Sequence, residues 1–415
     1  MQLPPSRPQC VRFLGTGGLF AFLACMLLLS ACCRPRDSGS ATVPLLLDHN
    51  RMLVDAAIQR RDGTWRRVRL WVDSGNRDFF ISEGLARDLG IDLSTAVIPT
   101  DGQRPPLEVP PPSVVRVGRV ALDFTGVKAM VMFEPRWLFD AMHNDANLPG
   151  SVLQRYQVVF DYPRRQLTLG EPGSLEHRGV RAAASVCAGS GIVQIDAVIE
   201  GDSLSLALDN GASYSFMSDE VLTRLSQRHP DWLRHVGALG GANMWGWWPH
   251  EDSWPVVRLP TIVWGTVPLR DVGVVGLPGI GTWYSQKTAR PVDGFLGPNA
   301  FKAFRVEIDY AERAVYFEKR GDVDSHDMDL VGLTLRLEPD GVYRVVGVAE
   351  KDGRPSVEGV LPGDRLLEVE ALQATGATMG TVVDALRGEP GDLRTLVVER
   401  DGERHTIRAR VERFL

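Results

Sequence analysis

An internal duplication constrains this chain more than any other feature of its sequence. Three blocks recur in the same order: residues 54–59 match 195–200, residues 70–89 match 206–225, and residues 147–169 match 295–317. The second and third pairs align without a gap. Duplicated units usually bury their faces against each other, and repeats this far apart belong to paired domains rather than to a solenoid. The sequence therefore predicts two related domains that pack as a pair.

Both copies have the pattern of β structure. Apolar runs at 70–72 and 206–208 end directly before Asp73 and Asp209. The segment 304–318 alternates apolar and polar residues on both sides of a turn, which is typical of a hairpin. A short helix is expected after each Asp-x-Gly, beginning near Ser82 or Ser218, because serine is a good N-cap.

The two Asp-x-Gly turns carry the residues with the clearest chemistry. Asp73 and Asp209 each follow a strand that reads as buried, whereas Asp37, in another Asp-Ser-Gly, lies in a polar stretch without a preceding strand. Two carboxyls held close together share a proton, so one can take a proton from water while the other gives one to a carbonyl oxygen. The alternative is that both aspartates are ordinary turn residues.

The second copy contains two motifs that resemble the retropepsin-like aspartic proteases: Asp-Asn-Gly-Ala-Ser at 209–213 and Val-Asp-Gly-Phe-Leu-Gly at 292–297. The resemblance covers residues 44–320. It implies a mainly β fold, with a six- or seven-stranded barrel per copy and one catalytic aspartate from each, joined as a pepsin-like pseudo-dimer. The residues it assigns to the site are the catalytic Asp73 and Asp209, supported by Ser74, Gly75, Asn210 and Gly211.

Departures from that family leave a second interpretation open. Asn210 stands where the family has a serine or threonine, whose hydroxyl ties the two active-site loops together. In the first copy, Asn76-Arg77 and Leu148-Pro149-Gly150 also differ from the family pattern. The favoured interpretation is a working aspartic endopeptidase, and the alternative is an inactive pseudoprotease that acts as a peptide-binding scaffold.

A tryptophan- and glycine-rich segment follows where the family places a flap over the cleft. The flap candidates are Gly241, Trp245, Gly246 and Trp247, with Trp254 close behind. The glycines suit a mobile hairpin, and the tryptophans could close on an apolar substrate and exclude water. A structural aromatic patch or a partner contact is the alternative.

The last part of the chain, 328–415, has the pattern of a compact α+β module. Five segments read as strands, Asp401-Gly402 suits a hairpin turn, and 381–388 suits a helix that Gly388 ends. The module resembles PDZ domains, whose carboxylate-binding loop and strand would be Gly332, Leu333, Thr334 and Leu335. That resemblance implies a groove, remote from the two aspartates, that adds an extended peptide of a substrate or partner as an extra strand. A structural or autoinhibitory module is the alternative.

The N-terminus has the features of an export signal. Arg7 and Arg12 precede an apolar run from Phe13 to Leu29, and the Leu-Ser-Ala-Cys that ends at Cys32 resembles the bacterial lipobox. We therefore expect a signal peptide at 1–31, a lipid on Cys32, and a chain exported and anchored to a membrane of the bacterial cell envelope. An uncleaved membrane anchor is the alternative. The domains that follow are a linker at 32–43, the two protease-like copies at 44–172 and 180–320, and the PDZ-like module at 328–415.

Charge and motif spacing exclude other classes of function. The formal net charge is −6, and the absence of basic clusters argues against nucleic acid as a partner. The eight histidines show no zinc-ligand spacing, so no metal and no cofactor is expected. Cys33 and Cys187 could form a disulfide or remain free thiols. The expected partners are a peptide or protein substrate and the membrane, with one chain forming a monomer by internal pseudo-dimerisation.

Overall fold

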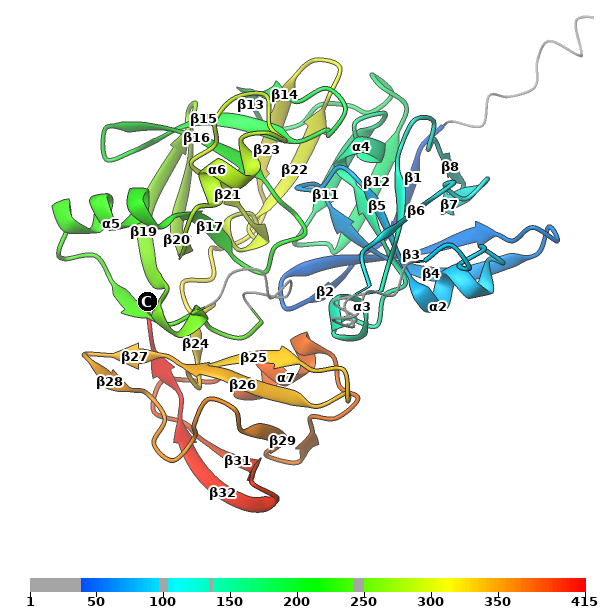
Figure 1. Ribbon diagram of the computed structural model, residues 1–415. Helices are drawn as coiled ribbons and strands as arrows, with labels where there is room; N and C mark the ends of the chain where they lie inside the picture. Colours follow the sequence, from blue (N-terminus) through cyan, green and yellow to red (C-terminus); the bar gives the residue numbers. More distant parts are fainter. Residues whose placement is uncertain (1–38, 97–103, 134–136, 242–249) are drawn as a thin grey trace, which may run out of the picture. The chain divides into compact units, whose positions relative to one another are not determined.

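The computed structural model describes residues 39–96, 104–133, 137–241 and 250–415. These residues form a mainly β protein, as expected (Figure 1). Among them no helix is long and apolar enough to cross a membrane. The two copies of the duplication are built on one sheet each and on a third sheet that they share.

The sheet of the first copy has nine strands in the order β6-β9-β5-β10-β4-β3-β7-β8, with β2 paired to β3. This path is open, so the first copy is a half-barrel rather than a closed one. Its strands are β2 (Leu46–Asp48), β3 (Arg51–Gln59), β4 (Trp65–Asp73), β5 (Phe79–Ser82), β6 (Leu107–Val109), β7 (Val115–Val117), β8 (Val120–Leu122), β9 (Ala129–Met132) and β10 (Ala146–Pro149).

The sheet of the second copy closes on itself. Its order is β14-β15-β16-β21-β17-β20-β19-β18-β27-β28, and an additional pairing of β15 with β19 completes a ring that starts and ends at β15. Its strands are β14 (Ser185–Val186), β15 (Val193–Ile199), β16 (Asp202–Leu208), β17 (Ser215–Ser218), β18 (Arg234–Val236), β19 (Pro255–Trp264), β20 (Val267–Leu277) and β21 (Gly294–Leu296), joined by β27 (Glu350–Lys351) and β28 (Arg354–Pro355) from the C-terminal module.

The third sheet joins the two copies through the hairpins expected in each. Its order is β1 (Ala41–Pro44), β12 (Gln166–Gly170), β11 (Gln157–Asp161), β22 (Phe304–Asp309), β23 (Ala314–Lys319) and β13 (Val180–Ala183). At its centre Val159 pairs with Glu307, and these two residues are equivalent in the duplicated blocks. A pseudo-two-fold axis therefore passes through this pair.

Strand β1 corrects the expected linker. Residues 41–43 were assigned to it because the stretch is polar and small, but they pair in register with β12, for example Val43 with Leu167. The pairing partner lies more than a hundred positions along the chain, which no local pattern reveals.

Short helices connect these sheets: α2 (Glu83–Asp88), α3 (Trp137–Asp140), α4 (Gly150–Leu153), α5 (Asp219–Arg228) and α6 (Ile280–Tyr284), with 3₁₀ turns η1 (Glu251–Ser253) and η2 (Pro298–Ala300). The helix after each Asp-x-Gly is present. Ser82 caps α2 by accepting from the Leu85 N–H. Ser218 stands at the start of α5 but makes no such bond, because its hydroxyl donates to the Glu220 carboxylate instead.

The C-terminal module (328–415) contains the five strands expected, further short strands and one helix. The elements are β24 (Asp329–Leu330), β25 (Leu333–Leu337), β26 (Tyr343–Val348), β29 (Arg365–Val369), β30 (Leu372–Gln373), α7 (Met379–Leu386), β31 (Leu393–Arg400), β32 (Glu403–Arg410) and β33 (Glu412–Arg413). The five expected strands are β25, β26, β29, β31 and β32. Asp401 and Gly402 make the hairpin turn with positive φ. Helix α7 ends before Gly388, because Arg387 already has an extended ψ of 160°.

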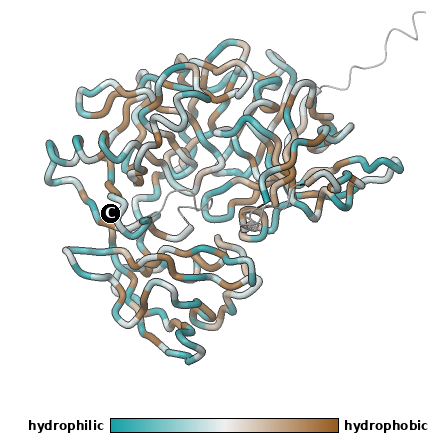
Figure 2. Tube along the Cα trace, in the orientation of Figure 1, coloured by the Kyte–Doolittle hydropathy of each residue, from teal (hydrophilic) through white to brown (hydrophobic). Residues whose placement is uncertain are grey.

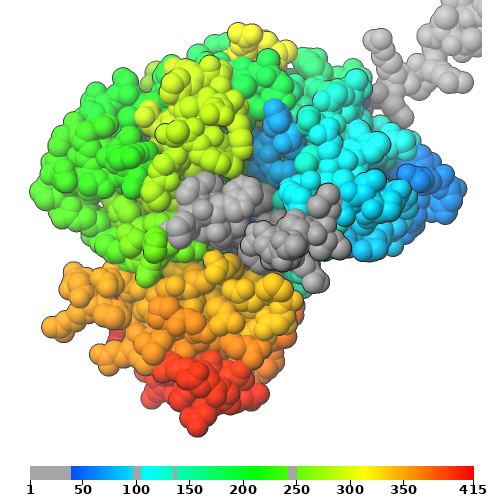
Figure 3. Space-filling model, viewed as in Figure 1, coloured from blue at the N-terminus to red at the C-terminus, as the bar shows by residue number. Residues whose placement is uncertain are grey.

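The C-terminal module packs directly against the second copy. Strands β27 and β28 extend the second copy's sheet, and one buried apolar cluster includes Trp254 and Val275 together with Leu333 and Val383. The apolar segments follow the strands of both parts (Figure 2). In the space-filling view, module residues border directly on those of the second copy (Figure 3).

Candidate active site

The two Asp-x-Gly turns occupy equivalent places in the two copies. Asp73 is the last residue of β4, and Asp209 directly follows β16. Each of these strands lies parallel to the short strand from the third duplicated block, so Val72 pairs with Leu148 and Leu208 with Leu296. The pseudo-two-fold symmetry therefore presents both aspartates to one site.

The Asp73 and Asp209 carboxylates each pack on the glycine of the other copy. A Cβ on Gly75 would lie 2.5 Å from Cγ of Asp209, and a Cβ on Gly211 would lie 2.7 Å from Oδ1 of Asp73. No side chain fits at such distances, so both positions need glycine. The structure thus brings together the four residues Asp73, Gly75, Asp209 and Gly211.

Asp209 accepts hydrogen bonds from the backbone N–H groups of Gly75, Gly211 and Ala212, and Asp73 accepts from the side chains of Asn76 and Asn147. The Gly211 N–H donates to Asp209 Oδ1 at 2.8 Å, and Asn147 Nδ2 donates to Asp73 Oδ2 at 3.4 Å. Asp73 is 4% exposed and Asp209 is 7% exposed. Burial raises the pKa of both groups, and the Asp209 charge raises the pKa of Asp73 further. The pair therefore keeps a proton to higher pH than two isolated carboxyls would.

The residues after the two aspartates are not equivalent. The Ser74 hydroxyl crosses to the other copy, where it donates to the Leu208 carbonyl at 3.4 Å and accepts from the Asn210 N–H at 3.0 Å. The Asn210 side chain does not return this contact. Its Oδ1 accepts from the Tyr162 hydroxyl at 2.6 Å, and its Nδ2 is buried without a hydrogen-bond partner among the described residues. Only one half of the inter-loop contact is thus made by a hydroxyl.

This asymmetry gives a first prediction. In Asn210→Thr the buried, unsatisfied Nδ2 is removed, which should stabilise the fold, but Tyr162 loses its acceptor, which should cost about 1 kcal/mol. Asn210→Thr combined with Tyr162→Phe removes both unsatisfied groups, so the double variant should be more stable than the single one. Denaturant unfolding measures the difference. Equal stability of the two variants would contradict the role given to the Tyr162–Asn210 bond, and cleavage activity should be kept or raised in both.

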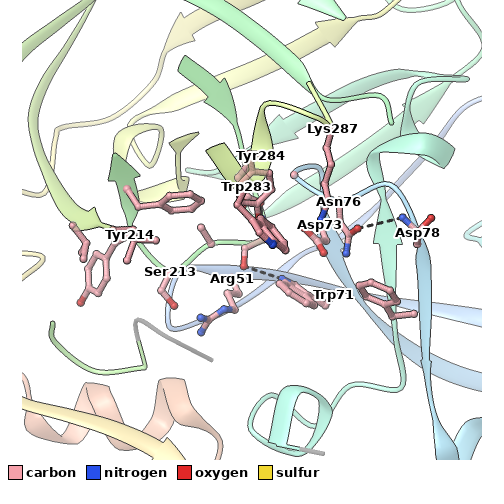
Figure 4. Close-up of a pocket in the computed structure, with 18 of the residues that line it drawn as sticks. Arg51, Trp71, Asp73, Asn76, Asp78, Ser213, Tyr214, Trp283, Tyr284 and Lys287 are labelled. Atoms are coloured by element: carbon pink, nitrogen blue, oxygen red, sulfur yellow. Dashed lines mark hydrogen bonds between the residues drawn. The ribbon is translucent and has the colours of Figure 1, made fainter. Parts of the chain in front are cut away.

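The aspartates lie in a cleft whose walls include seven aromatic side chains (Figure 4). The aromatic lining residues are Trp71, Phe80, Tyr214, Phe216, Trp254, Trp283 and Tyr284. Trp71 also links the copies, because its Nε1 donates to the Gly211 carbonyl at 3.1 Å. Lys287 lies over the Trp283 ring, with Nζ 3.5 Å from the ring centroid. This lining suits an extended chain with large apolar side chains.

Arg51 is the functional residue that the sequence did not point to. It lines the cleft, is 3% exposed, and donates from Nη2 to the Gly241 carbonyl at 3.1 Å. Its Nη1 has no hydrogen-bond partner among the described residues. The Arg51 charge lowers the pKa of both aspartates, against the effect of burial. An arginine at the start of an otherwise apolar strand gives no local signal of this role.

Several residues that the sequence predicts for the flap, the lipid site and the disulfide lie outside the described part. Trp245, Gly246 and Trp247 lie outside the described residues, as does Cys32. Gly241 is buried beside the C-terminal module, and Trp254 lines the cleft. Cys187 is a free thiol in the structure, and its candidate partner Cys33 lies outside the described part. Within the described part no cluster of side chains could hold a metal ion.

No family model and no curated protein matches the chain. Among solved structures, the crystal structure of the aspartic proteinase from Irpex lacteus is similar. It is 11% identical, with a TM-score of 0.40, and the match covers 68% of this chain and 97% of that one.

Proposed function

We propose that this protein is an aspartic endopeptidase that hydrolyses peptide bonds with a water molecule activated between Asp73 and Asp209. The observation that carries the proposal is the reciprocal packing of each carboxylate on the other copy's glycine. That packing holds two buried carboxyls together at the floor of a cleft, which is what acid–base hydrolysis by a shared proton needs.

The residues divide the chemistry as follows. The ionised member of the pair takes a proton from water, and the protonated member donates to the carbonyl oxygen of the scissile bond. Burial raises the pKa of both carboxyls, so the pair holds one proton at rest. Because the two groups share a proton, the titration belongs to the pair. Trp71 and Ser74 hold the two loops in register.

The second candidate is a pseudoprotease that binds peptides without cleaving them. The observation that favours it is the Asn210 side chain, which turns away to Tyr162 and leaves the inter-loop contact one-sided. A cleavage assay separates the two: purified protein is incubated with an unstructured protein below neutral pH, and the fragments are identified by mass spectrometry. The endopeptidase should yield fragments, at a specific activity that does not fall on tenfold dilution, because one chain supplies both aspartates. Binding without fragments would support the scaffold.

We also propose that the chain is exported and tethered by a lipid on Cys32, because the residues up to Cys32 have the pattern of a lipoprotein signal. Cys32→Ala should then leave the membrane fraction or stay unprocessed, whereas Cys33→Ala should behave as wild type. Cell fractionation with immunoblotting measures both. A Cys32→Ala protein that stays with membranes at its mature size would overturn this assignment.

A further inference from the structure

The edge of β25, which resembles a PDZ peptide-binding strand, is already paired with the chain's own backbone. Gly240 forms a parallel bridge with Thr334, in which the Gly240 N–H donates to the Leu333 carbonyl at 2.9 Å and the Leu335 N–H donates to the Gly240 carbonyl at 2.8 Å. The Thr334 hydroxyl also donates to the Ala238 carbonyl. Residues 238–241 thus take the place of an added strand.

The opposite wall of this groove is helix α7, and it fits residues 238–241 closely. A Cβ on Gly240 would lie 3.1 Å from Cγ2 of Val383, and a Cβ on Gly241 would lie 3.0 Å from the Met379 side chain. Gly240 also has a φ of +60°. A Cβ on Gly240 would also lie 2.7 Å from Nε2 of His49, so this position requires glycine, and Gly241 packs closely on α7. The segment is therefore a fitted occupant of the groove.

The start of α7 holds a second segment, the turn between β2 and β3 in the first copy. The Asp48 carboxylate accepts from the Gly380 N–H at 2.8 Å and from the Thr378 hydroxyl. Gly380 permits this approach, because a Cβ there would lie 2.6 Å from the backbone nitrogen of His49. A buried carboxylate at a helix N-terminus is stabilised by the amide groups and the helix dipole.

The same turn reaches the catalytic loop of the second copy. Asn50 Nδ2 donates to the Ser213 carbonyl at 2.7 Å, and the His49 ring lies 2.8 Å from the Ser213 hydroxyl. Burial lowers the pKa of His49 well below 6.5, so its ring stays neutral and the contact does not depend on pH near neutrality. The next residue is Arg51, whose guanidinium binds the Gly241 carbonyl. The turn therefore touches the Asp209 loop, the cleft and the groove occupant.

We propose that the C-terminal module is a positioning part of the catalytic unit, whose groove is occupied by residues 238–241 and whose helix α7 holds the 48–51 turn against the Asp209 loop. Asp48 and Thr378 are the positioning residues. This assigns the groove to the chain itself rather than to a recruited peptide. The activity readout rests on the proposed function, but the structural readout below does not.

The test is a double-mutant cycle in the full chain. Asp48→Ala and Thr378→Val each break the hydrogen bond between these two side chains, so each should lower kcat roughly tenfold or more with little change in KM. Asp48→Ala also removes the acceptor of the Gly380 N–H, and Thr378→Val also removes the N-cap hydroxyl of α7, which accepts from the Thr381 N–H. The double variant should be no worse than the worse single variant, because coupled residues are not additive. Thr378→Ser keeps the hydroxyl and should restore kcat. Thr406→Val, the same change at an exposed position of the module, should match wild type.

Hydrogen exchange supplies the readout that does not need cleavage. Peptides covering 211–215 and 238–241 should exchange faster in Asp48→Ala and Thr378→Val than in wild type or Thr406→Val. Unchanged exchange there, or independent additive losses of kcat, would overturn the proposal. So would saturable binding of an apolar decapeptide with a free C-terminal carboxylate that perturbs Thr334 and Leu335. If the wild type cleaves nothing, the endopeptidase proposal fails while the exchange result still decides this one.

Discussion

Asp73→Asn and Asp209→Asn should each lower kcat by about 10²–10⁴-fold, the usual range for loss of an acid–base group. Each change removes one of two carboxyls that must act together, because a single group cannot both accept the proton of water and protonate the carbonyl oxygen. KM should change little, since asparagine has nearly the shape of aspartate. Steady-state cleavage of an unstructured substrate, measured at several pH values, checks the effect.

A matched control is present in the same chain. Asp37→Asn makes the identical substitution in the other Asp-Ser-Gly, which the sequence places in a polar stretch without a preceding strand. It should retain wild-type activity, and thermal unfolding of all three variants should show that they fold. Activity that survives the loss of either Asp73 or Asp209 would exclude the paired mechanism.

Replacing Arg51 should move the pH profile of cleavage upward. The Arg51 charge favours ionised carboxylates and lowers the pKa of both aspartates. In Arg51→Met the pair loses that charge, so both pKa values rise and the singly protonated form persists to higher pH. The pH optimum should then shift up by roughly one unit, within the range expected when an opposite charge is removed from a carboxyl.

The control for this shift is Arg51→Lys, which keeps the positive charge and should leave the optimum closer to that of wild type. Two further groups bear on the interpretation, because Asp48 and Tyr214 act on the pKa of Arg51 together with Asp73 and Asp209. A downward shift in Arg51→Met, or the same shift in both variants, would contradict the account.

The sheets and the aspartate pair could be predicted because the duplication repeats local patterns. Apolar runs before Asp73 and Asp209, and the alternation in 304–318, correspond to β4, β16 and the β22–β23 hairpin. What the patterns did not contain was long-range pairing. The closure of β15 on β19 and the pairing of β1 with β12 depend on partners far along the chain. The prediction of a closed barrel is therefore correct for the second copy and wrong for the first, whose sheet is an open half-barrel.

The surroundings of the aspartates were harder to predict for a related reason. Arg51 lines the cleft and donates a hydrogen bond to the Gly241 carbonyl, and the Tyr162 hydroxyl donates to the Asn210 side chain from outside its segment. Neither residue stands out in its own segment. The sequence predicts a mobile hairpin at Gly241, whereas in the structure Gly240 and Gly241 pass close to α7. Glycine signals close approach as well as flexibility.

The titration of the two catalytic carboxyls tests the central claim most directly. Carbon NMR of protein labelled at the aspartate carboxyls follows the protonation of each carboxyl with pH and needs no substrate. The spectra of wild type and Asp209→Asn are compared. We expect one carboxyl of the wild-type pair to stay protonated well above the pH range in which exposed aspartates titrate. Asp209→Asn should lower the pKa of Asp73, because a neighbouring negative charge is removed. Two carboxyls that titrate in the ordinary range, each indifferent to the loss of the other, would contradict the paired mechanism.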